Sequence, residues 1–171
     1  FYRNKNNAWL SWPPRLMLRS NDVELINPRE DGNCLFNSII EQTAMTPQDS
    51  GSMRCDIMDY LLLNCDRKEG DLTWGQIALL QANDVVEQAR TRGIDLNITT
   101  VQEYADCMKE NRPNKCYWGD SLELKLIADK YRLNIAVYDE DITGKIYLLR
   151  ETCETSQDSS SAFILYTNGG T

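Results

Sequence analysis

The sequence predicts an α+β domain in which helices come first and a small, mostly antiparallel sheet, flanked by those helices, comes last. Two observations support this. Apolar residues recur at helical spacing in several segments between residues 34 and 132, and three short strand-like segments follow residue 133. A chain of 171 residues is also long enough to bury one core without disulfide or metal staples.

Five helices are predicted from this spacing. The first runs from residue 34 to about 44, since Phe36, Ile39, Ile40 and Thr43 fall on one face. Gly93 is expected to cap the third helix, and Asp120 with Glu123 forms a capping-box-like pair at the start of the fifth.

The other four predicted helices span residues 52–64, 73–92, 100–110 and 120–132. Met53, Ile57, Tyr60 and Leu61 fall at helical spacing in 52–64, which Gly70 ends, and Trp74, Ile77 and Leu80 do so in 73–92. Pro47 marks a loop before residue 52.

Three strands are predicted at residues 134–138, 145–150 and 162–167. The turn through Asp141-Ile142-Thr143-Gly144 predicts that the first two form a hairpin. A loop rich in Ser, Thr and acidic residues, 151–161, separates the second strand from the third.

The chain divides at about residue 21. Residues 1–21 contain Trp9, Trp12, Pro13 and Pro14 among polar residues, which predicts an irregular N-terminal arm; residues 22–171 form the main domain. The tryptophans either dock on that domain or contact a partner. Because the first residue is Phe and not Met, we expect the sequence to be a piece of a longer chain.

The net charge of −8 argues against a nucleic-acid partner, which would require a basic surface. It suits a basic protein partner, although the charge could equally serve solubility alone. The apolar runs, such as Leu61-Leu62-Leu63, are too short to cross a membrane, so no membrane association is expected. We expect a monomer.

The six cysteines show no pairing pattern, and a core of this size does not need disulfides. A reducing, cytoplasmic location is therefore expected, which would be the host cytosol for a viral or bacterial protein. There is no CxxC motif and no histidine, so zinc is not expected, and no cofactor is predicted.

One cysteine stands apart from the others. In Asp31-Gly32-Asn33-Cys34-Leu35-Phe36, a polar, glycine-containing turn becomes an apolar helix at Cys34. The unpaired N–H groups and the positive end of such a helix favour a thiolate, and the same N–H groups can stabilise an oxyanion. This pattern predicts a nucleophile, yet the sequence has no histidine to act as its base.

Three blocks of sequence resemble the ovarian-tumour (OTU) family of cysteine deubiquitinases. The first is Asp31-Gly32-Asn33-Cys34-Leu35-Phe36, similar to the family's D-G-N-C-x-F block. The second runs from Tyr117-Trp118-Gly119-Asp120 through Leu122-Glu123-Leu124 to Ile135–Tyr138, similar to the W-G-x-x-x-E-L helix and the strand after it. The third, residues 164–171, resembles the strand that leads into the family's H-Y or H-W pair.

The resemblance implies a papain-type cysteine protease fold and hydrolysis of isopeptide bonds to ubiquitin or a ubiquitin-like modifier. In the family the base histidine follows the segment that Asn168-Gly169-Gly170-Thr171 resembles, so we expect it just beyond Thr171. The chain as printed should then be severely impaired. The rival explanation is a degenerate relative that never had the base.

The resemblance also implies roles for individual residues. Cys34 is the expected nucleophile, and the other five cysteines are expected to be structural. Gly32 permits a tight turn, and Asp31 contributes to the oxyanion loop, orients the histidine or simply forms an Asp-Gly turn. Asn33 either helps to bind the oxyanion or caps the helix.

Two further site residues lie later in the chain. Trp118 either walls a groove for a Gly-Gly tail or packs in the core, and Asn168 either shapes the histidine loop or belongs to an ordinary Asn-Gly turn. Glu123 is interpreted as a capping residue.

Three functions remain open from the sequence. The leading hypothesis is a deubiquitinase that forms a thioester at Cys34. The second is a ubiquitin-binding pseudoenzyme, and the third is a viral-type polyprotein-processing cysteine protease.

Overall fold

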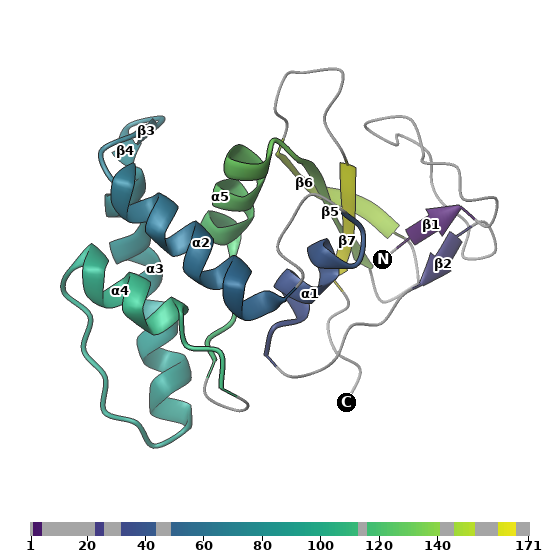
Figure 1. The fold of residues 1–171 in the computed structure, drawn as a ribbon. Helices are drawn as coiled ribbons and strands as arrows, with labels where there is room; N and C mark the ends of the chain where they lie inside the picture. Colours follow the sequence, from purple (N-terminus) through teal and green to yellow (C-terminus); the bar gives the residue numbers. More distant parts are fainter. Residues whose placement is uncertain are drawn as a thin grey trace.

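A computed structural model of the chain describes residues 2–4, 23–25, 32–43, 49–112, 116–140, 146–152 and 161–166. The main sheet has three strands, β5, β6 and β7. Figure 1 shows α2, α3 and α4 on one side of the molecule and this sheet on the other, with the β1–β2 pair beyond the sheet. The prediction of an α+β domain is confirmed.

All five predicted helices are present, with ends within a few residues of those expected. Their bounds are α1 Cys34–Ile40, α2 Ser50–Leu63, α3 Trp74–Thr91, α4 Val101–Met108 and α5 Ser121–Tyr131. Helix α2 contacts α1, α3, α4 and α5, so it is the central helix of the group.

Side-chain caps explain where these helices begin. The Asp49 carboxylate accepts a hydrogen bond from the Ser52 N–H at the start of α2. Helices α3, α4 and α5 each begin with a complete capping box. The capping pair predicted at the start of α5, Asp120 and Glu123, is confirmed. Gly93, with φ of +72°, follows the end of α3 as predicted.

The sheet contains β6 (Ile146–Thr152), β5 (Asn134–Glu140) and β7 (Ser161–Tyr166) in that order. Strand β5 pairs antiparallel with β6, as predicted for the hairpin, and parallel with β7. Because β5 is central, both of its edges are paired. The consecutive residues Ile135, Ala136 and Val137 are all buried, so both faces of β5 are covered as well.

Two short antiparallel strand pairs were not predicted from the sequence. Strand β1 (Tyr2–Asn4) pairs antiparallel with β2 (Val23–Leu25), so the arm at 1–21 begins in a strand and is not irregular throughout. Strand β1 also contacts β7. Strands β3 (Lys68–Glu69) and β4 (Leu72–Thr73) enclose Gly70, which was expected only to end α2. Trp9, Trp12 and the loop at Pro47 lie outside the described residues.

The core lies where α2 crosses the other helices. Met53, Ile57 and Leu61 of α2 are fully buried, as their spacing predicted. One prediction in α3 is wrong: Leu80 is 60% exposed, because the buried face of α3 passes through Ala78 and Ala82 instead.

Candidate active site

The turn before α1 and the first residue of that helix hold the candidate nucleophile. Helix α1 begins at Cys34, as predicted, and the Cys34 side chain is exposed. The Ser38 hydroxyl donates to the Cys34 carbonyl one turn later. The thiol therefore lies at the surface, on the first residue of a helix whose opposite side is buried through Phe36 and Ile39.

Gly32 gives the turn its shape. Its φ is +84°, which lies in the left-handed region where only glycine is unstrained. A Cβ atom here would also lie 2.5 Å from the Cys116 Sγ atom. The turn therefore requires glycine for two independent reasons, its backbone angle and its contact with Cys116.

Asn33 contacts the interior of the protein and does not cap the helix with its side chain. It is only 4% exposed, and its Oδ1 atom accepts a 2.7 Å hydrogen bond from the Nε atom of Arg54. No side-chain capping bond is made at the start of α1, so the capping interpretation of Asn33 is wrong. The amide oxygen is already engaged by a buried arginine.

The segment Tyr117-Trp118-Gly119 lies directly against the first turn of α1. A Cβ atom on Gly119 would lie 2.7 Å from Leu35 Cδ2 and 3.1 Å from the Phe36 ring. This close approach brings together the first two sequence blocks, which are more than 80 residues apart. A side chain at 119 would have to push aside the end of the Leu35 side chain and the Phe36 ring, so glycine allows this close approach to α1.

Three side chains from two helices, α2 and the C-terminal end of α3, hold this segment and the adjacent Cys116. The Trp118 N–H donates to Gln88 Oε1 of α3 at 2.9 Å, and Arg92 Nη1 donates to the Cys116 carbonyl at 2.9 Å. Arg54 Nη2 of α2 donates to the Tyr117 carbonyl at 2.7 Å. The segment is thus fixed on α2 and α3 although it has no regular secondary structure of its own.

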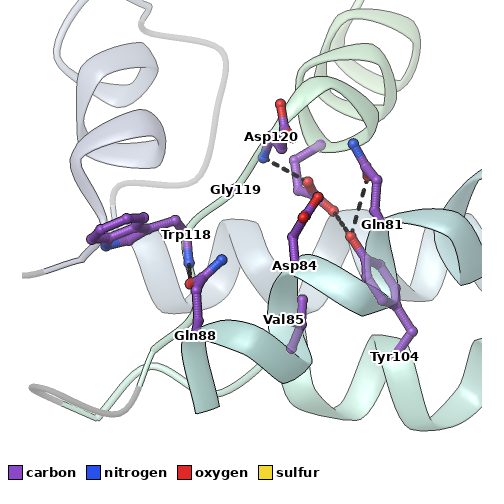
Figure 2. Close-up of a pocket in the computed structure, with 9 residues that line it drawn as sticks. Gln81, Asp84, Val85, Gln88, Tyr104, Trp118, Gly119 and Asp120 are labelled. Atoms are coloured by element: carbon purple, nitrogen blue, oxygen red, sulfur yellow. Dashed lines mark hydrogen bonds between the residues drawn. The ribbon is translucent and has the colours of Figure 1, made fainter. Parts of the chain in front are cut away.

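Trp118 itself is 61% exposed, so it does not pack in the core. Figure 2 shows its indole pointing away from Asp84 and Tyr104. Of the two interpretations from the sequence, core packing is therefore wrong, and the groove wall stays a prediction.

A pocket of about 110 Å³ lies on the other side of this segment, between α3 and the start of α5 (Figure 2). Asp84, Asp120 and Glu123 contribute its carboxyl groups. The full lining is Gln81, Asp84, Val85, Gln88, Tyr104, Trp118, Gly119, Asp120 and Glu123. It is an acidic pocket that shares Trp118 and Gly119 with the segment that packs against α1.

Glu123 is a fully buried carboxyl group with two hydrogen bonds. Its Oε2 atom accepts from the Asp120 N–H at 2.8 Å, and its Oε1 atom accepts from the Tyr104 hydroxyl at 2.8 Å. Burial raises the pKa of Glu123, and the hydrogen bonds from Asp120 and Tyr104 partly oppose this increase. Burial and the nearby Glu123 likewise raise the pKa of Tyr104.

This pKa shift predicts a pH dependence of stability. A carboxyl whose pKa is higher in the folded chain keeps its proton at pH values where the unfolded chain has lost it. Its contribution to stability therefore falls as the pH rises above the ordinary value of 4.5. In Glu123→Gln this group does not titrate, so the free energy of unfolding of wild type minus that of the variant should fall as the pH rises above 4.5. Urea denaturation at several pH values measures it.

Glu103 is a matched control, because it occupies the same position in the capping box of α4. Hydrogen bonds from Thr99 and Thr100 lower the pKa of this exposed carboxyl. Its contribution is therefore lost as the pH falls, and Glu103→Gln should show the opposite slope. Parallel slopes for the two variants would contradict the assignment of a raised pKa to Glu123.

A match to a protein-family model shows which family the chain belongs to. The model described as "OTU-like cysteine protease" matches residues 29–169. The chain belongs to the OTU-like cysteine protease family. This confirms the resemblance inferred from the three sequence blocks and, with it, the papain-type α+β fold.

Solved structures of similar fold include other OTU domains. The viral OTU domain protease from Farallon virus aligns with a TM-score of 0.51 and 15% identity, covering 85% of this chain and 79% of that one. The OTU domain of OTUD1 aligns with a TM-score of 0.50 and 13% identity, covering 85% of this chain and 78% of that one. An OTU deubiquitinase from Wolbachia pipientis wMel, bound to ubiquitin, aligns with a TM-score of 0.47 and 15% identity, covering 83% of this chain and 88% of that one. At such identities the likeness concerns the fold alone. A search of curated protein sequences found no match.

In this OTU-like cysteine protease, two predicted site residues lie outside the described part of the chain. Asp31 directly precedes Gly32, and Asn168 follows β7, so their roles stay predictions. The structure does show α1 in contact with β7. The first and third sequence blocks are therefore neighbours in the fold.

The other described cysteines differ from Cys34 in position and surroundings. Cys116 is buried, Cys65 and Cys107 are half-buried, and Cys55 is exposed on α2; Cys153 lies outside the described residues. Burial raises the pKa of the Cys107 thiol, and the Asp106 and Glu103 carboxylates raise it further. Cys107 is therefore a poor nucleophile.

Sequence reasoning missed Arg54, Gln88 and Arg92, which hold the two blocks in place. Arg54 is the one that a sequence signal could have revealed, because a charged residue among Met53, Ile57 and Met58 interrupts an apolar face. Two further findings concern the described residues alone. None of their helices is long and apolar enough to cross a membrane, and their His, Cys, Asp and Glu side chains form no cluster of three suited to a metal ion.

Proposed function

We propose that this chain is a thiol-dependent deubiquitinase, which hydrolyses isopeptide bonds to ubiquitin or a ubiquitin-like modifier through a thioester at Cys34. The observation that supports it most directly is the exposed Cys34 thiol on the first residue of α1, in the D-G-N-C-x-F block of an OTU-like cysteine protease. The Trp118-Gly119 segment packed against the same turn supports a substrate groove at this place.

The reaction has two steps. The Cys34 thiolate adds to the carbonyl carbon of the isopeptide bond, and main-chain N–H groups of the turn stabilise the resulting oxyanion. The C–N bond breaks as the lysine amine takes a proton from the general acid, which leaves a thioester on Cys34. Water then hydrolyses the thioester to a free carboxylate and restores the thiol.

The reaction also needs a base that deprotonates Cys34. The 171 residues contain no histidine that could serve as this base. We propose that an imidazole from outside these residues serves as the base and, once protonated, as the acid for the leaving amine. The net charge of −8 supports a modifier with a basic tail, because opposite charges raise the rate of encounter.

An electrophilic probe tests this proposal. A version of the chain extended past Thr171 by the residues that follow it in the gene is incubated with ubiquitin that carries a C-terminal electrophile. We expect one covalent adduct, located at Cys34 by mass spectrometry. Measurable binding of ubiquitin without an adduct would overturn the enzyme proposal.

The second candidate is a ubiquitin-binding pseudoenzyme, and the absence of histidine from the sequence favours it. Reading the gene past Thr171 separates the two candidates. A histidine followed by an aromatic residue supports the enzyme, whereas unrelated residues or a stop codon support the binder.

Trp118 offers a test of the groove. Because its side chain is exposed, Trp118→Ala should leave the melting temperature nearly unchanged and raise KM for a ubiquitin substrate about tenfold, the loss of one aromatic contact. Leu80→Ala is the control, since Leu80 is equally exposed, at 60%, on α3. An equal effect of both variants on KM would contradict a specific groove at Trp118.

A further inference from the structure

Arg54 is an arginine of α2 that is 0% exposed. Its Nε atom donates to Asn33 Oδ1 at 2.7 Å, and Nη1 donates to the Met108 carbonyl at 2.9 Å. Its Nη2 atom donates to the Gly32 carbonyl at 3.1 Å and to the Tyr117 carbonyl at 2.7 Å. The guanidinium also lies over the Phe36 ring, 4.1 Å from its centroid. One side chain thus joins the Cys34 turn, α1, the end of α4 and the segment before α5.

Burying a guanidinium removes a large hydration free energy, and apolar residues of similar volume often serve stability as well or better. The planar fork of donors offers something that an apolar residue cannot, which is fixed directions for several acceptors at once. Two of the acceptors, Gly32 and Asn33, directly precede Cys34, and a third, Tyr117, directly precedes Trp118. The contacts therefore concentrate on the two segments of the candidate site.

The direction of the Gly32 carbonyl has a consequence for the adjacent amide. In a trans peptide the C=O and the following N–H point to opposite sides of the chain. Because the Gly32 carbonyl points to the buried Arg54, the Asn33 N–H points away from Arg54. The same rule applies to Tyr117, and there the following Trp118 N–H is found on Gln88, away from Arg54.

We propose that Arg54 is a positioning residue for the Cys34 reaction. By holding the Gly32 carbonyl and the Asn33 amide, it orients the main-chain N–H groups of the turn that stabilise the oxyanion. By holding the Tyr117 carbonyl, it fixes the spacing between that turn and Trp118. The inference rests on the proposed thioester chemistry, and it assigns to Arg54 a role in kcat more than in substrate affinity.

Arg54→Lys tests the proposal, because it keeps the positive charge and removes the fork of donors. In the extended protein we expect kcat for a fluorogenic ubiquitin amide to fall about 10²- to 10³-fold, the effect of losing one oxyanion donor, with KM changed less than threefold. Arg90→Met is the control, because Arg90 is an exposed arginine paired with Glu87 on α3. It should leave both constants unchanged.

Alkylation of Cys34 by iodoacetamide separates positioning from general damage, since this displacement forms no oxyanion. We expect Arg54→Lys to leave the alkylation rate and its pH profile close to wild type while kcat falls. An equal fall in alkylation and kcat would indicate a disordered site and overturn the proposal. The proposal would also be overturned if the wild-type protein is active and Arg54→Lys has the same kcat as wild type.

Two further comparisons complete the test. If Arg54→Lys does not fold, Asn33→Ala decides, because it removes one acceptor and leaves the guanidinium in place. We expect it to lower kcat without lowering alkylation, and an unchanged kcat would overturn the proposal. Failure of the proposed function looks different, since the wild-type protein itself would then form no adduct with the ubiquitin electrophile.

Discussion

Replacing Cys34 by alanine should abolish hydrolysis of a ubiquitin amide, with kcat/KM in the extended protein falling by at least about 10⁴-fold. The reason is that Cys34 supplies the atom that bonds to the substrate carbonyl, so its removal eliminates the covalent route entirely. Fluorogenic ubiquitin substrates measure this loss. The melting temperature should hardly change, because the Cys34 side chain is exposed and its removal leaves no cavity.

Cys55→Ala provides the matched control for that experiment. Cys55 is also exposed and also lies on a helix, but it lies within α2 and not at the start of a helix. It should retain kcat/KM within about twofold, as expected for a surface substitution away from the site. Comparable losses in the two variants would show that general oxidation or instability, and not the thiol of Cys34, limits the activity.

The helices of this fold could be predicted because their signals are local. Apolar spacing within α2 placed Met53, Ile57 and Leu61 in the core, and the pair Asp120 and Glu123 marked the start of α5. Strand β1 was missed because three residues give too short a pattern, and because they pair with residues of β2 that lie 19 to 23 positions later in the chain.

The same distinction applies to the site. The position of Cys34 at the first residue of α1 follows from its neighbours in sequence. Two roles were open for Asn33, at the oxyanion or at the helix cap, and neither anticipated that the structure places its side chain on Arg54. The cause is a buried donor 21 residues later in the chain, which local sequence rules do not take into account.

Leu80 illustrates how periodicity alone can misplace a single residue of a helix. Of the apolar residues Trp74, Ile77 and Leu80, Trp74 is fully buried and Ile77 is half-buried against the core, but Leu80 is 60% exposed, and the buried side passes through Ala78 and Ala82. Small residues permit close packing of α3 on its neighbours, and a method that weighs residues by hydrophobicity favours leucine over alanine. Close packing depends on the neighbouring helices, and at this position of α3 it determines which residues are buried more strongly than hydrophobicity does.

Gly32→Ala should be the most disruptive substitution of a small residue in the site. A Cβ atom there adds strain at φ of +84° and lies 2.5 Å from the buried Cys116 Sγ atom. The strain alone costs about 1–2 kcal/mol, and the clash with Cys116 adds to it. We expect the free energy of unfolding in urea to fall by more than about 2 kcal/mol, with loss of kcat as the turn moves away from its position on Arg54.

Gly93→Ala and Gly70→Ala isolate the strain from the clash, because both glycines have positive φ, +72° and +61°, and no atom within 4 Å of the added Cβ. Each should cost about 1–2 kcal/mol and leave kcat unchanged. Adding Cys116→Ala to Gly32→Ala removes the Sγ atom and with it the clash. The free energy of unfolding lost in the double variant should then be close to the loss in each of the two controls. If Gly32→Ala alone matches those controls in stability yet still loses kcat, the turn has shifted enough to relieve the clash with Cys116. Activity then depends on the position of the turn itself, because a shifted turn no longer places the Cys34 sulfur and the oxyanion donors on the same carbonyl group.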